Sequence, residues 1–313
     1  MFPTTFIYSA HNCSPYIHRD IIVERALREP DDKRLLYLPM SEGMRGDDEY
    51  ERQEYGYSKF RWFLEQYRGW GLEPQPFYWS SHMDHDDVEV LIELLVNAPV
   101  VILGGGNTQT GMQRYQAIGE WFYGDPHMFC RLLHDRQARG QMTVGFSAGA
   151  DQLSSLFSYA ADIDGDAEGF GLARDIVVTL HHEWGQEGKL QYGAQAIPHC
   201  YWFGLPNDSG LAINTGVLPS GLIWQTVGFV IDKSWDLPQD QFHIKTRAGM
   251  KIDHFYRDGR SWAFNGGDSM LRLMSPDGSY RRSWMTVGGN LLEYWEQCPS
   301  EYDSYEHILH DHA

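Results

Sequence analysis

The sequence of 313 residues predicts an α/β fold, in which helices flank a mostly parallel sheet and a β-rich C-terminal extension follows. Over the first third of the chain, short apolar runs alternate with longer amphipathic stretches, which is the pattern of βαβ units. After Gly216, short strands separated by turn signals replace this pattern. A chain of this length can bury a large core, either as one large α/β domain or as one domain with an appended β-rich region.

The first strands are expected at four apolar runs, TFIYSA, RLLYLPM, PFYW and APVVILGGG, at residues 5–10, 34–40, 76–79 and 98–106. Between the second and third runs, residues 55–71 place apolar side chains at helical spacing and end in two glycines, which predicts a crossover helix. Residues 86–97 repeat the helical pattern, with acidic residues in the first turn.

Two further helices are expected at about 112–122 and 128–137, before the segment QMTVGFSAGA at 141–150. This segment predicts a buried strand, a sharp turn and a new helix. Later strands are expected within DIVVTL, LIWQTVGFVID, HIKTR, KIDHFYRDGRSWAF and SMLRLMSPDGSYRRSWMTVGG, at 175–180, 222–232, 243–247, 251–264 and 269–289. Turns are expected at 257–260 and 276–279. The tail from Glu293 is expected to form a terminal helix or a loosely held end.

The charge of the chain argues against two classes of partner. The formal net charge is −18, from 43 Asp and Glu against 25 Lys and Arg, and it would repel both nucleic acid and an anionic membrane. Residues 1–9 lack the basic start and long apolar run of a signal peptide, and no window reaches the roughly 18 apolar residues of a membrane span. We therefore expect a cytoplasmic protein. Its four widely spaced cysteines favour free thiols over a disulfide framework or a zinc site.

The segment TVGFSAGADQL, at 143–153, contains a candidate nucleophile, Ser147. A serine hydroxyl attacks a carbonyl only when a base takes its proton and fixed donors receive the oxyanion. A G-x-S-x-G turn between strand and helix lifts the hydroxyl above the sheet and leaves the N–H of Ala148 free at a helix N-terminus. The alternative is that Gly145 and Gly149 merely allow the helix to pack closely on the sheet.

The segment VILGGGNTQTGMQRY, at 101–115, places three glycines at a strand end before a helix. Such a loop can donate backbone N–H groups to an anion. A nucleotide-binding role is disfavoured, because neither a Walker A motif nor a full G-x-G-x-x-G motif is present. We therefore expect this loop to supply a second oxyanion donor.

The segment GFGLARDIVVTLHHEWGQEGKL, at 169–190, places His181 and His182 at the end of an apolar strand. The carboxyl ends of parallel strands form the edge where binding and catalytic sites assemble. As an alternative, a histidine pair can lie exposed on the surface without a role, or can make structural hydrogen bonds. The presence of the two preceding motifs favours a catalytic role.

These motifs resemble, in their order and spacing, those of the dipeptidase E and cyanophycinase family of serine peptidases. The order is GGGNT, then GFSAGA, then GFGL followed by an apolar strand that ends in His. The resemblance covers about residues 1–232. It implies a flavodoxin-like three-layer fold related to class I glutamine amidotransferase domains. Residues 233–313 would then form a β-rich extension packed on the same domain.

The resemblance implies roles for individual residues. Ser147 falls on the nucleophile and His181 on the general base, with His182 as the alternative base. The oxyanion hole would be formed by N–H groups of Gly105, Gly106 and Ala148. Asn107 and Gln109 would line the pocket.

The third member of the triad falls on Asp162, about fifteen residues after the serine. Asp164, Asp166 and Glu168 are rivals for this role in the same acidic segment, YAADIDGDAEGF. The acid would orient His181 and stabilise the imidazolium, without accepting its proton. The alternative is an acidic loop with no catalytic part.

Two departures from the family bear on the substrate. Cyanophycinases carry an arginine-rich stretch after the histidine, which is absent here, so recognition of that polymer is not expected. Dipeptidase E prefers an N-terminal aspartate, for which Arg114 or Lys189 would supply the cation. Trp184 would form either a wall of the substrate site or a packing contact. The C-terminal extension would cap the pocket, add a subunit interface of a homodimer, or do both.

The sequence thus predicts a serine peptidase that cleaves a small peptide or isopeptide through an acyl-enzyme, with no metal and no organic cofactor. Two alternatives stay open: a serine esterase or amidase acting on a non-peptide acyl substrate, and a non-catalytic binding module of the same fold. A glutamine amidotransferase is disfavoured, because its elbow carries cysteine. The segment SHMDHDD, at 81–87, holds residue types that bind metals, but acids at a helix start explain it better.

Overall fold

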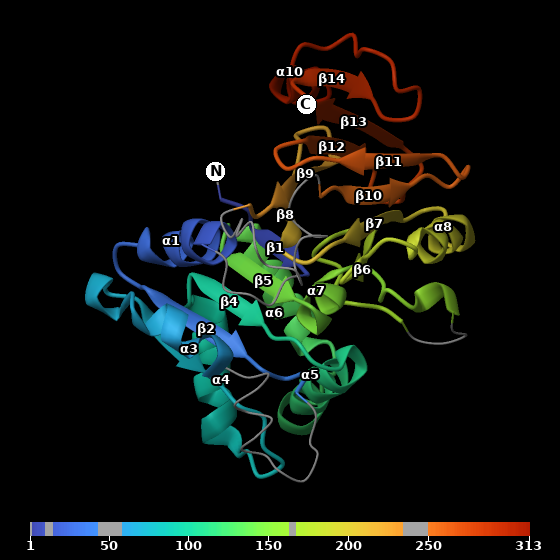
Figure 1. Cartoon of the computed structure of the whole chain (residues 1–313). Coiled ribbons are helices and arrows are strands. Elements are labelled where there is room, and N and C mark those ends of the chain that lie inside the picture. Colours follow the sequence, from blue (N-terminus) through green and yellow to red (C-terminus); the bar gives the residue numbers. More distant parts are fainter. Residues whose placement is uncertain (1, 10–14, 43–57, 163–166, 234–249) are drawn as a thin grey trace.

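The computed structural model of the chain describes residues 2–9, 15–42, 58–162, 167–233 and 250–313. Over these ranges the protein is a mixed α/β structure, with one ten-stranded sheet, one four-stranded sheet and helices packed against them (Figure 1). The expected α/β class is therefore confirmed. The expected segment HIKTR lies outside the described residues.

The helices are η1 (Pro15–Val23), α1 (Glu24–Leu27), α3 (Ser58–Glu65), η2 (Arg68–Trp70), α4 (His85–Asn97), α5 (Thr108–Tyr123), α6 (Met128–Ala138), α7 (Ala148–Leu153), η3 (Ala160–Asp162), α8 (Glu187–Ala196) and α10 (Tyr305–Asp311). The strands are β1 (Thr5–Tyr8), β2 (Arg34–Leu38), β3 (Glu73–Pro76), β4 (Val100–Leu103), β5 (Met142–Phe146), β6 (Ile176–Leu180), β7 (Tyr201–Leu205), β8 (Ser209–Val217), β9 (Ile223–Ile231), β10 (Ile252–Phe255), β11 (Ser261–Phe264), β12 (Ser269–Met274), β13 (Arg281–Val287) and β14 (Asn290–Glu293).

The large sheet has the order β14-β13-β12-β9-β8-β1-β5-β4-β2-β3. On one side of β1, the strands β1-β5-β4-β2-β3 pair in parallel. On the other side, the strands β1-β8-β9-β12-β13-β14 all pair in antiparallel fashion. The expected parallel pairing is therefore confirmed for β1-β5-β4-β2-β3, while β8, β9 and the strands of the C-terminal extension join the same sheet by antiparallel pairing. The links between β8 and β9 and between β12 and β13 are shorter than the dozen or more residues that a parallel crossover needs.

The C-terminal strands divide between the two sheets. β12, β13 and β14 extend the large sheet beyond β9, and Figure 1 shows them with α10 at the end of the molecule away from β2. β10 and β11 pair with β7, which in turn pairs in parallel with β6. Residues 250–313 thus share both sheets with the residues before them, rather than forming a separate sheet.

Successive residues of the parallel strands face opposite layers of helices. On one face, Leu36 and Leu38 of β2 belong to a core that includes residues of α4, α5 and α6. On the other face, Leu35 and Tyr37 pack with residues of η1, α1 and α3. This period-two alternation explains why strands buried on both faces appear in the sequence as continuous apolar runs.

The ends of several elements differ from the expected ones. β3 lies three residues earlier than the PFYW run. α5 begins at Thr108, because Asn107 caps it by accepting a hydrogen bond from the Thr110 N–H at 2.8 Å. The SHMDHDD segment starts helix α4 as expected, through a capping box between Asp84 and Asp87. No helix among the described residues is long and apolar enough to cross a membrane.

His254, on β10 of the four-stranded sheet, is a fully buried histidine. Its Nδ1 lies 2.7 Å from the Trp202 carbonyl oxygen and its Nε2 lies 2.6 Å from the Tyr294 hydroxyl. The neutral ring satisfies both contacts, with Nδ1–H donating and Nε2 accepting. Burial lowers the pKa of His254 from 6.5 to about 4.

We predict that this histidine makes the fold sensitive to mild acid. Because the unfolded chain binds the proton more readily, His254 is expected to lower the free energy of unfolding by about 3 kcal/mol between pH 6.5 and pH 4. Urea unfolding of the wild type and of His254→Gln at pH 7 and pH 4 measures this contribution. The difference in stability between the two proteins should shrink by about that amount, and an unchanged difference would contradict the prediction.

Candidate active site

Ser147 occupies the sharp turn between β5 and α7, with φ 50° and ψ −120°. Both flanking glycines are required there. A Cβ on Gly145 would lie 2.3 Å from the Gly149 carbonyl oxygen, and a Cβ on Gly149 would lie 2.1 Å from the Leu103 carbonyl oxygen. The positive φ of a non-glycine residue is strained, and such strain is typical of functional turns. The glycines therefore permit close packing and, with it, the elbow.

His181 lies directly after β6 and faces the serine. Its Nε2 is 3.4 Å from the Ser147 Oγ, a separation common for catalytic pairs that tighten on binding substrate. The backbone N–H of His181 donates to the Ser9 Oγ at 2.5 Å. Because Ser9 follows β1 of the large sheet and His181 follows β6 of the small one, this bond fixes the histidine across the two sheets. His181 also has a positive φ, of 52°.

Asn207, in the turn between β7 and β8, completes a hydrogen-bonded relay. Its Oδ1 lies 2.6 Å from the His181 Nδ1. When Nδ1 carries the proton and donates to Oδ1, the lone pair of Nε2 is directed at Ser147, which is the tautomer that a general base requires. The relay of described residues is therefore Ser147–His181–Asn207.

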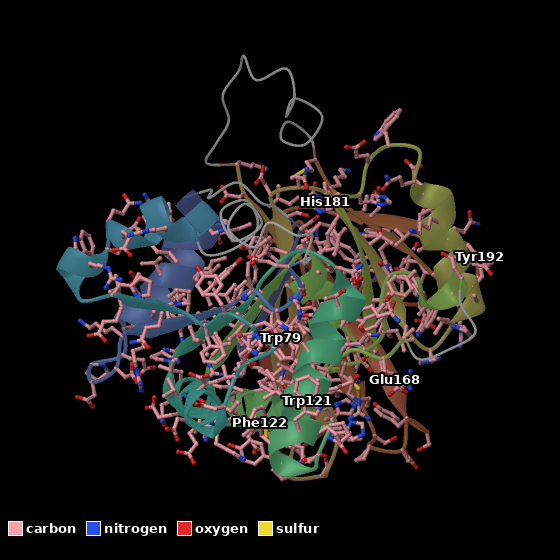
Figure 2. All side chains as sticks on the ribbon, turned by 90° about the horizontal axis from the view of Figure 1, so that it is seen from below. Trp79, Trp121, Phe122, Glu168, His181 and Tyr192 are labelled. Atoms are coloured by element: carbon pink, nitrogen blue, oxygen red, sulfur yellow. The ribbon has the colours of Figure 1, made fainter. Side chains whose placement is uncertain are left out.

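Asp162, expected to orient His181, does not do so. It is exposed at the end of η3, and among the described residues it makes no hydrogen bond to the histidine. The Tyr192 hydroxyl donates to the Ala161 carbonyl oxygen at 3.2 Å and holds η3 against α8. Glu168 is exposed and lies well away from His181 (Figure 2). The remaining rivals, Asp164 and Asp166, lie outside the described residues.

His182, the alternative base, points away from the serine. It is buried against Gly204, with Nδ1 3.2 Å from the Thr179 Oγ1. Its Nε2 lies 3.3 Å from the Asp253 Oδ2, within ion-pair range but outside hydrogen-bond geometry. The two histidines thus have separate surroundings, and of the two only His181 contacts Ser147.

The glycine loop after β4 approaches the serine. A Cβ on Gly105 would lie 3.4 Å from the Ser147 Cβ, and Gly106 has φ 129° with no room for a side chain beside the Ser41 carbonyl oxygen. In the described part of the chain, the N–H groups of Gly105, Gly106 and Ala148 donate no hydrogen bond. They can therefore donate hydrogen bonds to an oxyanion near the Ser147 hydroxyl.

Three polar residues expected in the pocket have different positions. Asn107 and Gln109 are exposed beside the glycine loop, and the Asn107 side chain caps α5. Arg114 is buried, where it donates to the carbonyl oxygens of Met40 at 2.8 Å and Glu42 at 2.6 Å and lies over the ring of Trp79. Arg114 therefore anchors the segment around Met40, and the expectation that it supplies a pocket cation was wrong.

Trp184 and Lys189 follow His181 in the chain, in the loop after β6 and in α8. Lys189 is exposed in the first turn of α8 and close enough to Asp151 to lower the pKa of that carboxyl. Trp184 is 97% exposed on the loop after β6, so it is not packed against the described residues. A wall of the substrate site remains its expected role.

Sequence reasoning missed Asn207 and Ser9. Both follow the carboxyl end of a strand, as do Gly104, Ser147 and His181. β6 and β7 are parallel with Leu180 opposite Leu205, so the residues after them meet at one edge. A search for polar residues after every strand of a parallel pair would have selected Asn207, but β7 was not recognised as a strand.

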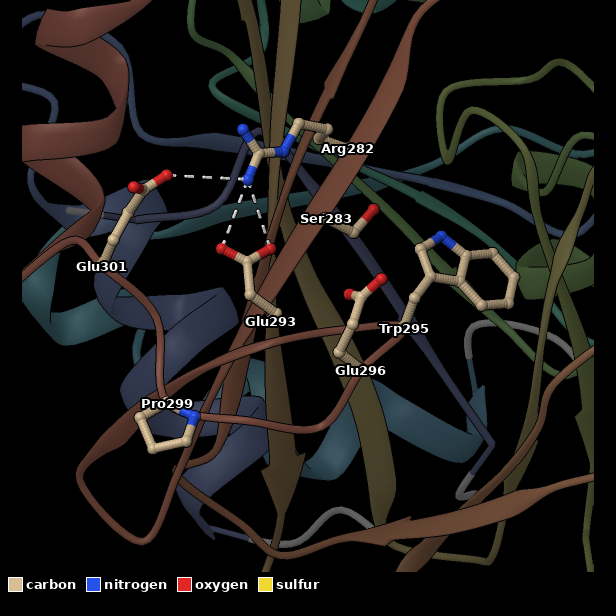
Figure 3. A pocket seen from close by; sticks show the side chains of 7 residues that line it. All are labelled: Arg282, Ser283, Glu293, Trp295, Glu296, Pro299 and Glu301. Atoms are coloured by element: carbon tan, nitrogen blue, oxygen red, sulfur yellow. Dashed lines mark hydrogen bonds and ion pairs between the residues drawn. The ribbon is translucent and has the colours of Figure 1, made fainter.

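A hollow of about 400 Å³ lies in the C-terminal strands (Figure 3). Three of its charged groups pair: Arg282 contacts both Glu293 and Glu301, and the Trp284 Nε1–H donates to Glu293 at 2.7 Å. None of the residues expected in the active site lines it. Within the described ranges, no three His, Cys, Asp or Glu side chains are grouped as a metal ion would require.

Neither a scan against protein-family models nor a search of curated proteins found a match to this chain.

Proposed function

We propose that this protein is a serine hydrolase that cleaves a small peptide or isopeptide through an acyl-enzyme on Ser147. The observation that carries the proposal is the relay of Ser147, His181 and Asn207, with contacts of 3.4 and 2.6 Å, at an elbow beside free N–H groups. We also propose membership of the dipeptidase E and cyanophycinase family, with its flavodoxin-like fold. The motif order and the parallel strands β1-β5-β4-β2-β3 support this assignment.

The geometry supports a two-step reaction. His181 Nε2 takes the Ser147 proton as the oxygen attacks the substrate carbonyl, and the oxyanion receives hydrogen bonds from the glycine loop and Ala148. The imidazolium then gives its proton to the leaving amine, and the acyl-enzyme forms. A water molecule, deprotonated by the same nitrogen, attacks the acyl-enzyme and releases the acid with the serine restored.

Asn207 makes the relay different from one that contains a carboxylate. Its amide oxygen orients His181 but, being uncharged, stabilises the imidazolium less than an acid would. An amine leaving group needs the proton of that imidazolium more than an alkoxide does. Asn207 therefore favours a second candidate function, hydrolysis of a non-peptide ester. A binding module without catalysis is disfavoured, because His181 reaches the serine.

A covalent probe and a substrate panel test the proposal. A fluorophosphonate is expected to add one adduct to the intact protein, mapped by peptide mass to Ser147. Asp-X dipeptides, β-aspartyl dipeptides and simple esters then separate a peptidase from an esterase, and we expect turnover of a dipeptide class. A folded protein that is not labelled, or that is labelled at another serine, would contradict the assignment of Ser147.

A further inference from the structure

Thr108, the first residue of α5, is held by two consecutive residues of α7. Its hydroxyl donates to the Asp151 Oδ2 at 3.2 Å, and its carbonyl oxygen accepts from the Gln152 Nε2 at 2.9 Å. Thr108 is separated from the glycine loop, residues 104–106, by Asn107 alone, and α7 directly follows Ser147. These two bonds therefore connect the helix of the nucleophile to the loop that faces it.

Asp151 is a buried carboxyl group one helical turn from Ser147. It also accepts hydrogen bonds from the Ser158 N–H at 2.9 Å and the Ser158 Oγ at 3.2 Å. Burial raises its pKa from 3.8 to about 6, against the lowering by these hydrogen bonds and by the charge of Lys189 on α8. Tyr159 is the other titratable group that senses this charge.

The burial of Asp151 carries a cost in stability. At neutral pH the group is ionised in the folded protein, and burial of the charge opposes folding. The sign follows from its raised pKa: the chain gains stability from this group below pH 3.8 and loses it as the pH rises through about 6. A buried charge beside a candidate site, kept at a cost, is a feature of functional positions.

Gln152 holds the same loop from a second direction. Its side chain is buried, and its Nε2 donates to the Ser41 Oγ at 2.9 Å as well as to Thr108. The Ser41 carbonyl oxygen in turn accepts the Asn107 N–H at 2.7 Å. Gly111 leaves the space for this contact, because a Cβ there would lie 2.2 Å from the Gln152 Nε2.

We propose that Asp151 and Gln152 are positioning residues that, through Thr108, hold the N–H groups of the glycine loop in line with the Ser147 hydroxyl. The inference rests on the proposed hydrolase function. Misplacing an oxyanion donor weakens binding of the transition state more than binding of the substrate. The network therefore acts on kcat with little effect on KM.

Thr108→Val tests the network, because it removes the hydroxyl and keeps the shape of the side chain. We expect kcat to fall about 10- to 100-fold with KM within about twofold, while Thr108→Ser restores most of the rate. Ser158→Ala is the matched control: it removes a hydroxyl from the same carboxylate without touching the loop, and its kcat should stay within about threefold. A kcat loss in Ser158→Ala equal to that in Thr108→Val would overturn the proposal.

Asp151→Asn separates geometry from charge. The amide can donate to the hydroxyls of Thr108 and Ser158 and accept from the Ser158 N–H, so the contacts survive without the buried charge. We expect most of the activity to remain and the melting temperature at pH 8 to rise. Asp151→Ala, in contrast, should lose activity as Thr108→Val does. Equal losses in Asp151→Asn and Asp151→Ala would contradict positioning by these hydrogen bonds.

Hydrogen exchange provides a readout independent of catalysis. The Asn107 and Gly111 amides donate to Ser41 and to the Asn107 carbonyl oxygen, and they should exchange faster in Thr108→Val but not in Ser158→Ala. If these rates change while the wild type neither hydrolyses the panel nor labels at Ser147, the positioning network stands and the hydrolase proposal fails. If the wild type is active and Thr108→Val changes neither exchange nor kcat, the network proposal fails alone.

Discussion

Ser147→Ala is expected to abolish hydrolysis and fluorophosphonate labelling, with a loss of at least about 10³-fold and up to about 10⁶-fold in kcat. The hydroxyl is the group that forms the acyl-enzyme, and among the described residues its one hydrogen-bond partner is His181, with no capping bond to α7. The variant should therefore unfold at a temperature close to that of the wild type. A folded Ser147→Ala protein that keeps wild-type rates on an accepted substrate would falsify the proposed function.

The backbone at Ser147 allows a second, structural test of the same position. Its φ of 50° and ψ of −120° are strained for alanine as for serine, but not for glycine. Ser147→Gly is thus expected to be inactive yet more stable than Ser147→Ala. Relief of the backbone strain should raise its free energy of unfolding by about 1–3 kcal/mol, and the greater entropy of the unfolded glycine offsets part of this gain. A glycine variant that is less stable than Ser147→Ala in urea unfolding by the full entropy difference, about 0.5–1 kcal/mol, would indicate that the turn stores no strain.

The local part of the site could be predicted from the sequence because its determinants are local. Gly145 and Gly149 flank the serine within five residues, and the clash distances show that a side chain at either would close the turn. The glycine loop could be predicted for the same reason, because its N–H groups lose their partners in the sheet where strand β4 ends. Periodicity over short windows also predicted β1, β2, β4 and β5 and the helices α3, α4, α5 and α6, whereas η1 and α1, between β1 and β2, were not predicted.

The long-range part of the site could not be predicted. Asn207 meets His181 only because β6 and β7 pair in parallel, and that register exists after folding and not in any window of sequence. Asp162 was chosen by its distance along the chain from Ser147, which does not determine where η3 lies. Arg114 was chosen for its charge, but its Nη1 donates to two backbone carbonyl oxygens of the segment around Met40.

His181→Ala is the second variant with a large expected effect, and its neighbour supplies the control. Without the imidazole, nothing among the described residues takes the Ser147 proton, so kcat should fall by at least about 10³-fold. His182→Gln should retain kcat within about threefold, because His182 is packed against Gly204 and contacts Thr179 and Asp253 instead of Ser147. Loss of labelling in His182→Gln and not in His181→Ala would reverse the assignment of the base.

Residues that act as one unit show losses that do not add, which gives the assignment of the base a stricter test. The double variant Ser147→Ala/His181→Ala is expected to be no slower than Ser147→Ala alone, because the base has no proton to take once the hydroxyl is gone.

Asn207→Ala should reduce kcat less than Ser147→Ala or His181→Ala does, because it frees the ring of His181 without removing it. Asn207→Asp should retain hydrolysis and move the acidic limb of the pH–rate profile to higher pH, because a carboxylate favours the imidazolium. An unmoved limb would mean that Asn207 does not act through His181.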